Sequence, residues 1–169
     1  SASSLREVTR VAGIVPAAFY RHFSNMDELG IELVEYSFRP LRMMLKEIRE
    51  QPKGTSRLIT KSTDAFLRYV RSHRKFFIFL VRERSGGVPT VRKAIRAQLN
   101  EIIAELAEDI RKLKPFAALS PEDTITVSSL AVDTMILSTE LALDLPPGES
   151  EEETALHKDT ARRLQIIFA

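Results

Sequence analysis

One short segment near the start of the chain, residues 13–23, limits its fold more than any other. Gly13 ends an amphipathic stretch, as glycine does where the chain turns through a left-handed conformation. Pro16 can begin a second helix because its missing N–H costs nothing at that position. Only Ile14 and Val15 lie between the two. So short a connection between helices predicts a helix-turn-helix, the geometry that lets the second helix enter the major groove of DNA.

The first helix of this unit is expected to begin at Ser4, which forms with Glu7 the S-x-x-E pattern of a capping box. Apolar residues then recur at spacings of three and four, and this face should pack against Phe19 and Phe23 of the second helix. The residues of the apolar face are Leu5, Val8, Val11 and Ala12.

The small and polar side chains left on the outer faces are the candidates for contact with DNA. Small residues at the start of the second helix let its backbone approach base edges, while Tyr, Arg and His side chains donate to phosphate oxygens. The predicted DNA-binding residues are Arg6, Ala17, Ala18, Tyr20, Arg21 and His22. Alternatively, the segment is a plain helical hairpin in which Tyr20 and His22 are ordinary surface residues.

The net charge of +2 is concentrated in residues 1–23. Of the 25 basic and 23 acidic residues, three arginines and one glutamate lie before Ser24, so the 22 of each sign that remain cancel. A local positive excess favours contact with a polyanion such as DNA.

Composition excludes several other classes of protein. At 169 residues, 44% of them apolar, the chain can bury a sizeable core. It has no cysteine for disulfides or thiolate metal sites. No apolar run is expected to reach the roughly 20 residues that cross a membrane, and no signal peptide is present, so a cytoplasmic location is expected. The three histidines are scattered and no phosphate-binding glycine loop occurs, so no enzyme, metal or cofactor is expected.

The rest of the chain is predicted to be helical because its apolar residues recur with helical spacing. Asn25 and Glu28 form a second cap pair, and Pro40 should bend the long helix that follows or break its hydrogen bonding. Ser120 with Pro121 marks another helix start. The expected helices are residues 25–50, 56–73, 76–84, 90–114, 120–144 and 150–169.

Residues 4–29 resemble the DNA-binding signature of TetR-family transcriptional repressors, T/S-h-R-x-h-A-x-x-A-G-V-S-x-x-x-h-Y-x-H-F, followed by the start of a long connecting helix. Thr9, Val15 and Met26 depart from that signature, and Met26 replaces a lysine that often binds a phosphate. The resemblance implies an all-α, TetR-like fold. A helix-turn-helix DNA-binding head with its connecting helix would occupy residues 1–46, and a helical effector-binding and dimerisation body residues 47–169. Relatives carry one more helix before this motif, so we expect the head to be incomplete at its N-terminus.

The resemblance also implies a homodimer that binds a near-palindromic operator in double-stranded DNA. The last two helices of each subunit are expected to form a four-helix interface about a twofold axis. The residues predicted for it are Ile125, Ser128, Ser129, Val132, Ile136 and Thr139, with Leu156, Leu164, Ile167 and Phe168 on the final helix. Alternatively, these positions complete the core of the monomer.

Large apolar side chains concentrate in residues 66–80. Such a cluster forms either a close-packed core or one wall of an apolar effector cavity. The residues predicted for a cavity are Phe66, Tyr69, Phe76, Phe77, Phe79 and Leu80, with Ile103, Leu106, Met135 and Leu141 opposite.

A second resemblance favours the cavity. Residues 76–86, F-F-I-F-L-V-R-E-R-S-G, are similar to a segment of the FabR and DesT regulators of unsaturated fatty acid synthesis, and residues 13–23 are similar to their head. This implies a long, dry tunnel for an acyl thioester of coenzyme A or acyl carrier protein. Arg82, Arg84 and Arg92 are candidate anchors for its phosphates, or alternatively members of a salt-bridge lattice with neighbouring acids.

Two other functions remain open from the sequence. One is a TetR-type repressor of an efflux or catabolic operon that senses a hydrophobic or cationic small molecule, which Asp133 and Glu140 would bind from one helix face. The other is a helical adaptor that binds only protein, which the head motif disfavours.

Overall fold

The computed structural model describes residues 5–49, 55–113, 116–146 and 150–169. Within these ranges the chain forms helices and no strand, which confirms the predicted all-α fold. The helices are α1 (Leu5–Ala12), α2 (Pro16–Phe19), α3 (Met26–Arg49), α4 (Thr55–Ser72), α5 (Arg74–Gly86), α6 (Pro89–Arg111), α7 (Pro121–Asp144) and α8 (Glu151–Ile167).

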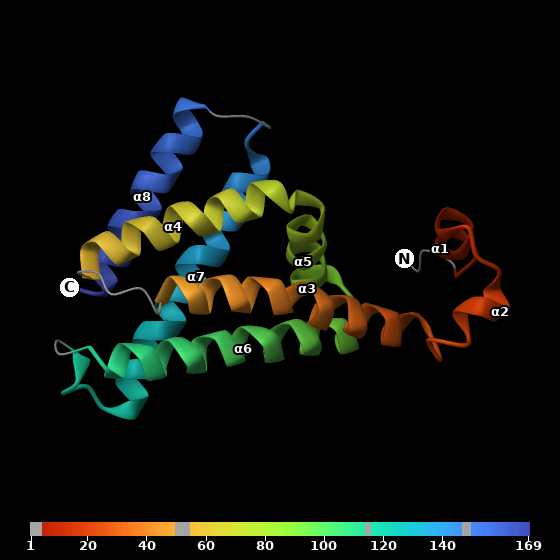
Figure 1. The fold of residues 1–169 in the computed structure, drawn as a ribbon, viewed down its shortest axis with the longest axis horizontal. Coiled ribbons are helices and arrows are strands. Elements are labelled where there is room, and N and C mark those ends of the chain that lie inside the picture. The colour runs from red at the N-terminus through yellow and green to blue at the C-terminus, as the bar shows by residue number, and fades with distance from the viewer. Residues whose placement is uncertain (1–4, 50–54, 114–115, 147–149) are drawn as a thin grey trace.

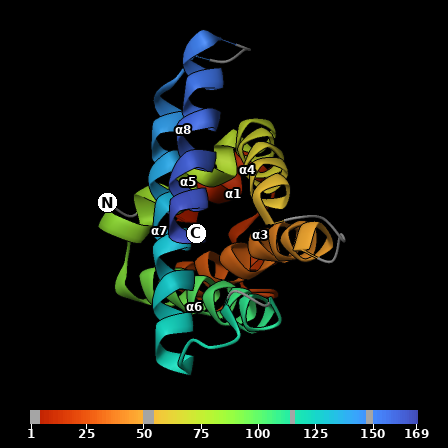
Figure 2. The ribbon, with the colours of Figure 1, turned by 90° about the vertical axis from the view of Figure 1, so that its left-hand side faces the viewer.

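The helices form a small head and a larger body, joined by α3 (Figure 1). Helices α1 and α2 pack on each other at the far end of α3, apart from the rest of the molecule. The part of α3 away from the head lies between α4 and α6. Helices α7 and α8 run side by side on the side opposite the head (Figure 2). The long helix α3 therefore connects the two ends of the molecule directly.

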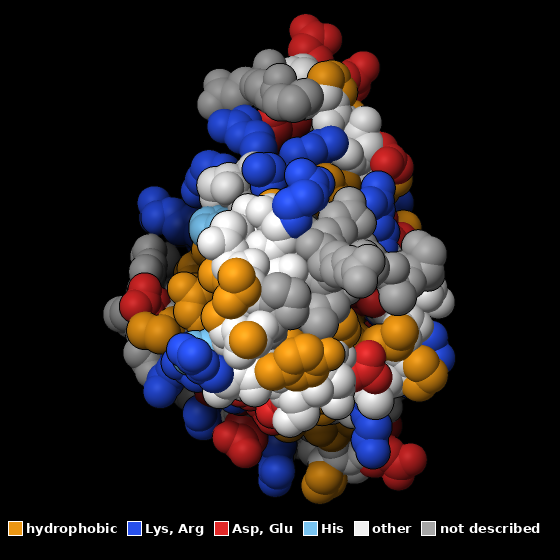
Figure 3. Space-filling model, turned by 90° about the vertical axis from the view of Figure 1, so that its right-hand side faces the viewer, with side chains coloured by type: hydrophobic (Ala, Val, Ile, Leu, Met, Phe, Trp, Pro, Cys, Tyr) orange, Lys and Arg blue, Asp and Glu red, His pale blue; other side chains and the backbone are white. Residues whose placement is uncertain are grey.

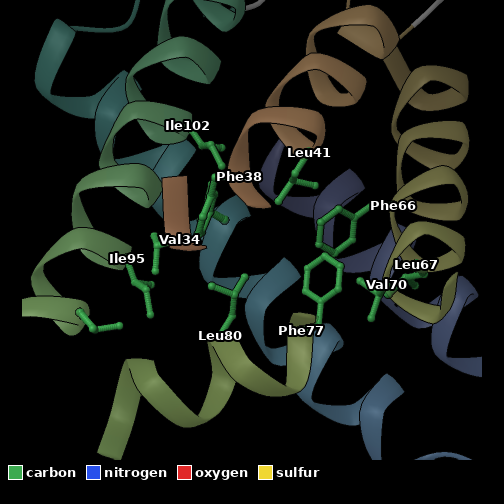
Figure 4. Packing of buried hydrophobic residues seen from close by; sticks show 12 residues of the cluster. Val34, Phe38, Leu41, Phe66, Leu67, Val70, Phe77, Leu80, Ile95 and Ile102 are labelled. Carbon is green, nitrogen blue, oxygen red and sulfur yellow. The ribbon is translucent and has the colours of Figure 1, made fainter. Parts of the chain in front are cut away.

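The core of the body is built where α3, α4, α5, α6 and α7 meet (Figure 4). Val34 and Phe38 of α3, Leu67 of α4 and Ile95 of α6 are almost completely buried in it. The rings of Phe66 and Phe77 meet edge to face, with their centroids 5.9 Å apart, an arrangement that adds to the gain from burial. Because α3 contributes to this core, the predicted domain boundary between residues 46 and 47 falls inside a continuous helix.

Most predicted helix starts are formed as expected. The Oγ of Ser120 accepts a hydrogen bond from the Asp123 N–H at 3.0 Å, and the Oδ1 of Asn25 accepts one from the Glu28 N–H at 2.9 Å. The Glu28 carboxylate, however, accepts from the Ser24 N–H rather than from Asn25. The predicted cap at Ser4 lies outside the described residues, as does the predicted helix end at residue 114.

Pro40 does not end α3, which continues through it to Arg49, but the proline removes one backbone hydrogen bond of the helix, as expected. Pro40 is exposed. The carbonyl of Tyr36, which loses its N–H partner to the proline, lies in an exposed residue and can bond to water instead.

Helix α7 corrects another expectation, because by length and composition it is apolar enough to cross a membrane. It is nonetheless one helix of a bundle and packs against α4, α6 and α8. Asp133, near its middle, is exposed, and a carboxylate at that depth would be costly in a bilayer. Contact with protein explains its exposed apolar face better than contact with lipid does.

Candidate DNA-binding head and apolar cavity

The turn between α1 and α2 depends on Gly13. Its φ of +69° is a left-handed conformation, which costs other residues roughly 1–2 kcal/mol. The Gly13 N–H donates to the Arg10 carbonyl at 3.2 Å, and the Ile14 N–H donates to the Thr9 carbonyl at 3.0 Å. These two bonds form a Schellman motif that ends α1 and turns the chain sharply into α2.

Three consecutive polar side chains project from the head just after α2. Phe19, which is 2% exposed, anchors the segment, and its ring lies 5.5 Å from those of both Tyr20 and Phe23. Tyr20, Arg21 and His22 are all exposed. Figure 3 views the molecule from the head end, where hydrophobic side chains lie over the middle of the face and Lys and Arg side chains lie above and below them. The three exposed polar side chains offer donors to an anionic partner.

The second helix of the pair is shorter than predicted. It ends at Phe19, and the N–H groups of Arg21 and His22 donate to Ala18 and Phe19 in a following turn, at 3.3 and 2.9 Å. Tyr20, Arg21 and His22 therefore lie in a turn and not along a helix face. Of the other predicted contact residues, Ala17 is exposed and Ala18 is half-buried. Arg6 lies on α1, and its side chain is outside the described part of the chain.

The predicted inward face of α1 is wrong at two positions. Val11 is 75% exposed and Ala12 is also exposed, whereas Thr9 is buried. The reason is geometric, because α1 packs mainly against α2 and the short α2 covers only one side of it. Ile14 and Val15 are exposed as well, so this side of the head is an apolar surface.

The body contains an apolar cavity of about 260 Å³ between α3, α4, α5, α6, α7 and α8. Along α6 its wall is a single stripe from Ile95 to Ile110. The lining residues are Phe38, Leu41, Leu45, Ile48, Leu58, Ile59, Ser62, Thr63, Phe66, Phe77, Leu80, Val81, Arg84, Ile95, Leu99, Ile102, Leu106, Asp109, Ile110, Leu113, Ala131, Val132, Met135, Ile136, Thr139, Leu164 and Phe168. The described walls thus combine a hydrophobic interior with few polar groups, as expected of a site for an apolar ligand.

A family model described as the tetracycline repressor-like C-terminal domain matches residues 55–167, which hold most of this body. That match covers more than half of the chain. The chain belongs to the TetR family. A protein of Haemophilus influenzae named as an uncharacterized HTH-type transcriptional regulator is 40% identical to it over 107 residues, which are 63% of this chain and 52% of that protein. The chain therefore spans about half the length of this relative.

Half of the predicted effector residues line the cavity of this TetR-family body. Those in its wall are Phe66, Phe77, Leu80, Leu106 and Met135. Tyr69, Phe76, Phe79 and Ile103 instead pack against the core as partly buried residues, and Leu141 is exposed. The phase of α5 explains the difference, because residues three or four positions apart share a face and Phe77, Leu80 and Arg84 hold the inner one. The α3 stripe from Phe38 to Ile48, which was expected only in the long connecting helix, forms another wall of the cavity.

The three candidate arginine anchors do not converge on one site. Arg84 lines the cavity and pairs with Glu140. Arg92 donates to the Gly87 carbonyl, and Arg82 is exposed outside the lining. Neither Asp133 nor Glu140 is in the cavity wall, so the two acids do not form the predicted site for a cation there. Among the described residues, no three His, Asp or Glu side chains are grouped to hold a metal ion.

Much of the predicted dimer face of α7 and α8 belongs to the monomer core. Ser128, Val132, Thr139 and Leu164 are buried within the single chain. The hydroxyls of Ser128 and Thr139 donate to carbonyls one turn earlier in α7, both at 2.8 Å, which satisfies them there. The apolar residues that do face outward on these two helices are Ile125, Leu130, Leu137, Leu141 and Ile166.

Proposed function

We propose that this TetR-family chain acts in a homodimeric, ligand-responsive transcriptional regulator, a repressor that binds double-stranded DNA through its head and an apolar effector in its body. The observation that carries the proposal is that one helix reaches both sites. The first residues of α3 adjoin the head, and Phe38, Leu41 and Leu45 of the same helix line the cavity. A ligand that moves α3 therefore moves the head.

On the DNA side, we assign the main contacts to Tyr20, Arg21 and His22. Their exposure and hydrogen-bonding groups suit phosphate oxygens, whereas Ala17 leaves room for close approach of the backbone to base edges. A second copy of the chain would present the same side chains to the other half of a near-palindromic operator.

As effector we propose an acyl thioester of coenzyme A or acyl carrier protein, with genes of fatty acid desaturation or synthesis as targets. The shape of the cavity supports a chain-like ligand. The α6 stripe from Ile95 to Ile110 is about 22 Å long at a rise of about 1.5 Å per residue. A bent, unsaturated chain and a straight one would displace different neighbours in such close-packed walls. Each would then stabilise the DNA-binding arrangement to a different degree.

DNA selection followed by effector titration tests this proposal. Duplexes selected from a genomic fragment library should bind the protein with an affinity that falls steeply as salt rises, because binding releases counterions. Oleoyl-CoA and palmitoyl-CoA should change that affinity to different extents. If the protein selects no duplex, or if neither thioester changes the affinity for one, the corresponding half of the proposal is wrong.

A double variant connects this test to the proposed contacts. Tyr20→Phe combined with His22→Ala should weaken binding to all duplexes by roughly tenfold, the equivalent of about 1.4 kcal/mol, because it removes hydroxyl and imidazole donors to phosphate. Tyr36→Phe, which alters an exposed tyrosine of α3, is the control and should leave binding unchanged. Unchanged affinity in the double variant would remove both residues from the interface.

A further inference from the structure

Arg84, at the end of α5, lies in the cavity wall and at the protein surface at once. Its Nη1 donates to the Oε1 of Glu140 on α7 at 3.1 Å, and the two side chains are 37% and 39% exposed. Such a half-exposed ion pair contributes little to stability, because water screens the charges. Its geometry can therefore change at small cost.

The other polar groups of the described wall are already engaged. The hydroxyls of Ser62, Thr63 and Thr139 donate to carbonyls of their own helices at 2.7, 2.9 and 2.8 Å. Asp109 accepts from the Nζ of Lys112 at 2.7 Å. Among the described lining residues, Arg84 is the only Lys or Arg, and its guanidinium has five N–H donors. A ligand with an acidic end would find its best partner at this point of the wall.

We propose that Arg84 is the specificity-determining residue for the polar end of the effector, and that an anionic oxygen group of the ligand replaces Glu140 as its partner. The inference rests on the proposed function, in which the cavity holds the effector. It also identifies the chemical group of the effector that is recognised and the contact that this group breaks. A carboxylate or phosphate of the ligand takes the place of the Glu140 carboxylate beside the Arg84 guanidinium, so the charge of Arg84 stays paired. A neutral chain of equal length would fill the cavity without releasing Glu140.

The exchange also has a structural consequence. The Arg84–Glu140 pair joins α5 to α7, and α5 leads through Gly87 into α6. At the start of α6, the Oγ1 of Thr90 donates to the Oδ2 of Asp27 on α3 at 2.8 Å. An anionic ligand therefore releases a link between α5 and α7 a few residues from the point where α6 holds the start of α3.

The test compares dodecanoate, dodecanoyl-CoA and 1-dodecanol as probes, with dissociation constants measured by calorimetric titration. Arg84→Gln should weaken binding of at least one of the two anionic probes by about tenfold, as loss of a charged hydrogen bond does. Glu140→Gln should strengthen binding of the same probe by roughly threefold, because it leaves Arg84 with a neutral competitor. Neither change should alter the affinity for 1-dodecanol. An effect on dodecanoate identifies a free carboxylate as the recognised group, and an effect on the thioester alone identifies a phosphate.

Arg82→Gln, an exposed arginine of the same helix that is not in the cavity wall, is the matched control and should leave all three affinities unchanged. The double variant Arg84→Gln, Glu140→Gln should behave as Arg84→Gln alone. Circular dichroism would verify that each variant is folded. Equal losses for the anions and 1-dodecanol, or no loss for any probe, would overturn the role of Arg84 and leave the cavity as an effector site. Failure of all three probes to bind the unaltered protein would overturn the proposed effector class as well.

Discussion

Glu28 lies where the head joins α3. The hydrogen bond from the backbone N–H of Ser24 favours the ionised carboxylate and lowers the pKa of Glu28 below its ordinary value of 4.5. A pKa that folding lowers adds stability at pH values above 4.5, and this stability is lost as the pH falls through the folded value. The start of α3 should therefore loosen only in acid, below pH 4.5.

Glu28→Gln tests this at neutral pH, because a neutral amide accepts the same hydrogen bond more weakly. We expect faster hydrogen exchange at the Ser24 amide in the variant at pH 7, and equal rates in both proteins, relative to the intrinsic rate, once the pH is well below 4.5. Glu32→Gln, an exposed glutamate one turn further along α3, is the control and should leave this amide unchanged. A difference that persists at low pH would show that the charge of Glu28 is not the cause.

Helices α3 and α6 approach closely at Gly30. A Cβ placed on Gly30 would lie 2.7 Å from the Cγ2 of Val91, which is buried, so any larger residue must push the two helices apart. Gly30→Ala should lower the free energy of unfolding by roughly 1–3 kcal/mol, as overpacking does. Urea denaturation would measure this. Val91→Ala in the same chain should restore part of the loss, whereas additive losses in the double variant would mean that the two residues do not compete for space.

The sequence predicts where helices begin and end better than it predicts how they pack. The C-terminal end of α1 depends on the left-handed turn at Gly13, and the N-terminal end of α7 depends on the cap at Ser120. Both are local signals and both were predictable. The face that a helix turns inward depends on neighbours far away in sequence. Periodicity therefore predicted that Val11 faces inward, although it is exposed. It also could not predict the contact of Arg84 with Glu140, which lies 56 residues later in the sequence. For the same reason, the sequence did not distinguish Phe77, which lines the cavity, from the adjacent Phe76, which packs around the core.

Across the whole molecule, helix α7 lies on the side opposite the head (Figures 1 and 2), and it has an exposed apolar face. Leu130, Leu137 and Leu141 share that face at helical spacing and are 51%, 44% and 44% exposed. An apolar stripe on the surface of a monomer commonly marks a protein interface. Pairing through this face would leave both heads uncovered, as contact of each head with an operator half-site requires.

Leu137→Glu should therefore convert the proposed dimer to a monomer while leaving the fold intact, because the side chain is half in solvent already and the new carboxylate would be buried only in the interface. Sedimentation equilibrium should show an increase in the dimer dissociation constant of at least about 100-fold, equivalent to about 2.7 kcal/mol. Leu33→Glu is the matched control, since Leu33 is 42% exposed on α3 and not on α7. A monomeric unaltered protein, or equal weakening by both changes, would rule out α7 as the interface. Loss of DNA binding in Leu137→Glu alone would further show that the two heads act together, because a single head would bind one half-site just as well in either variant.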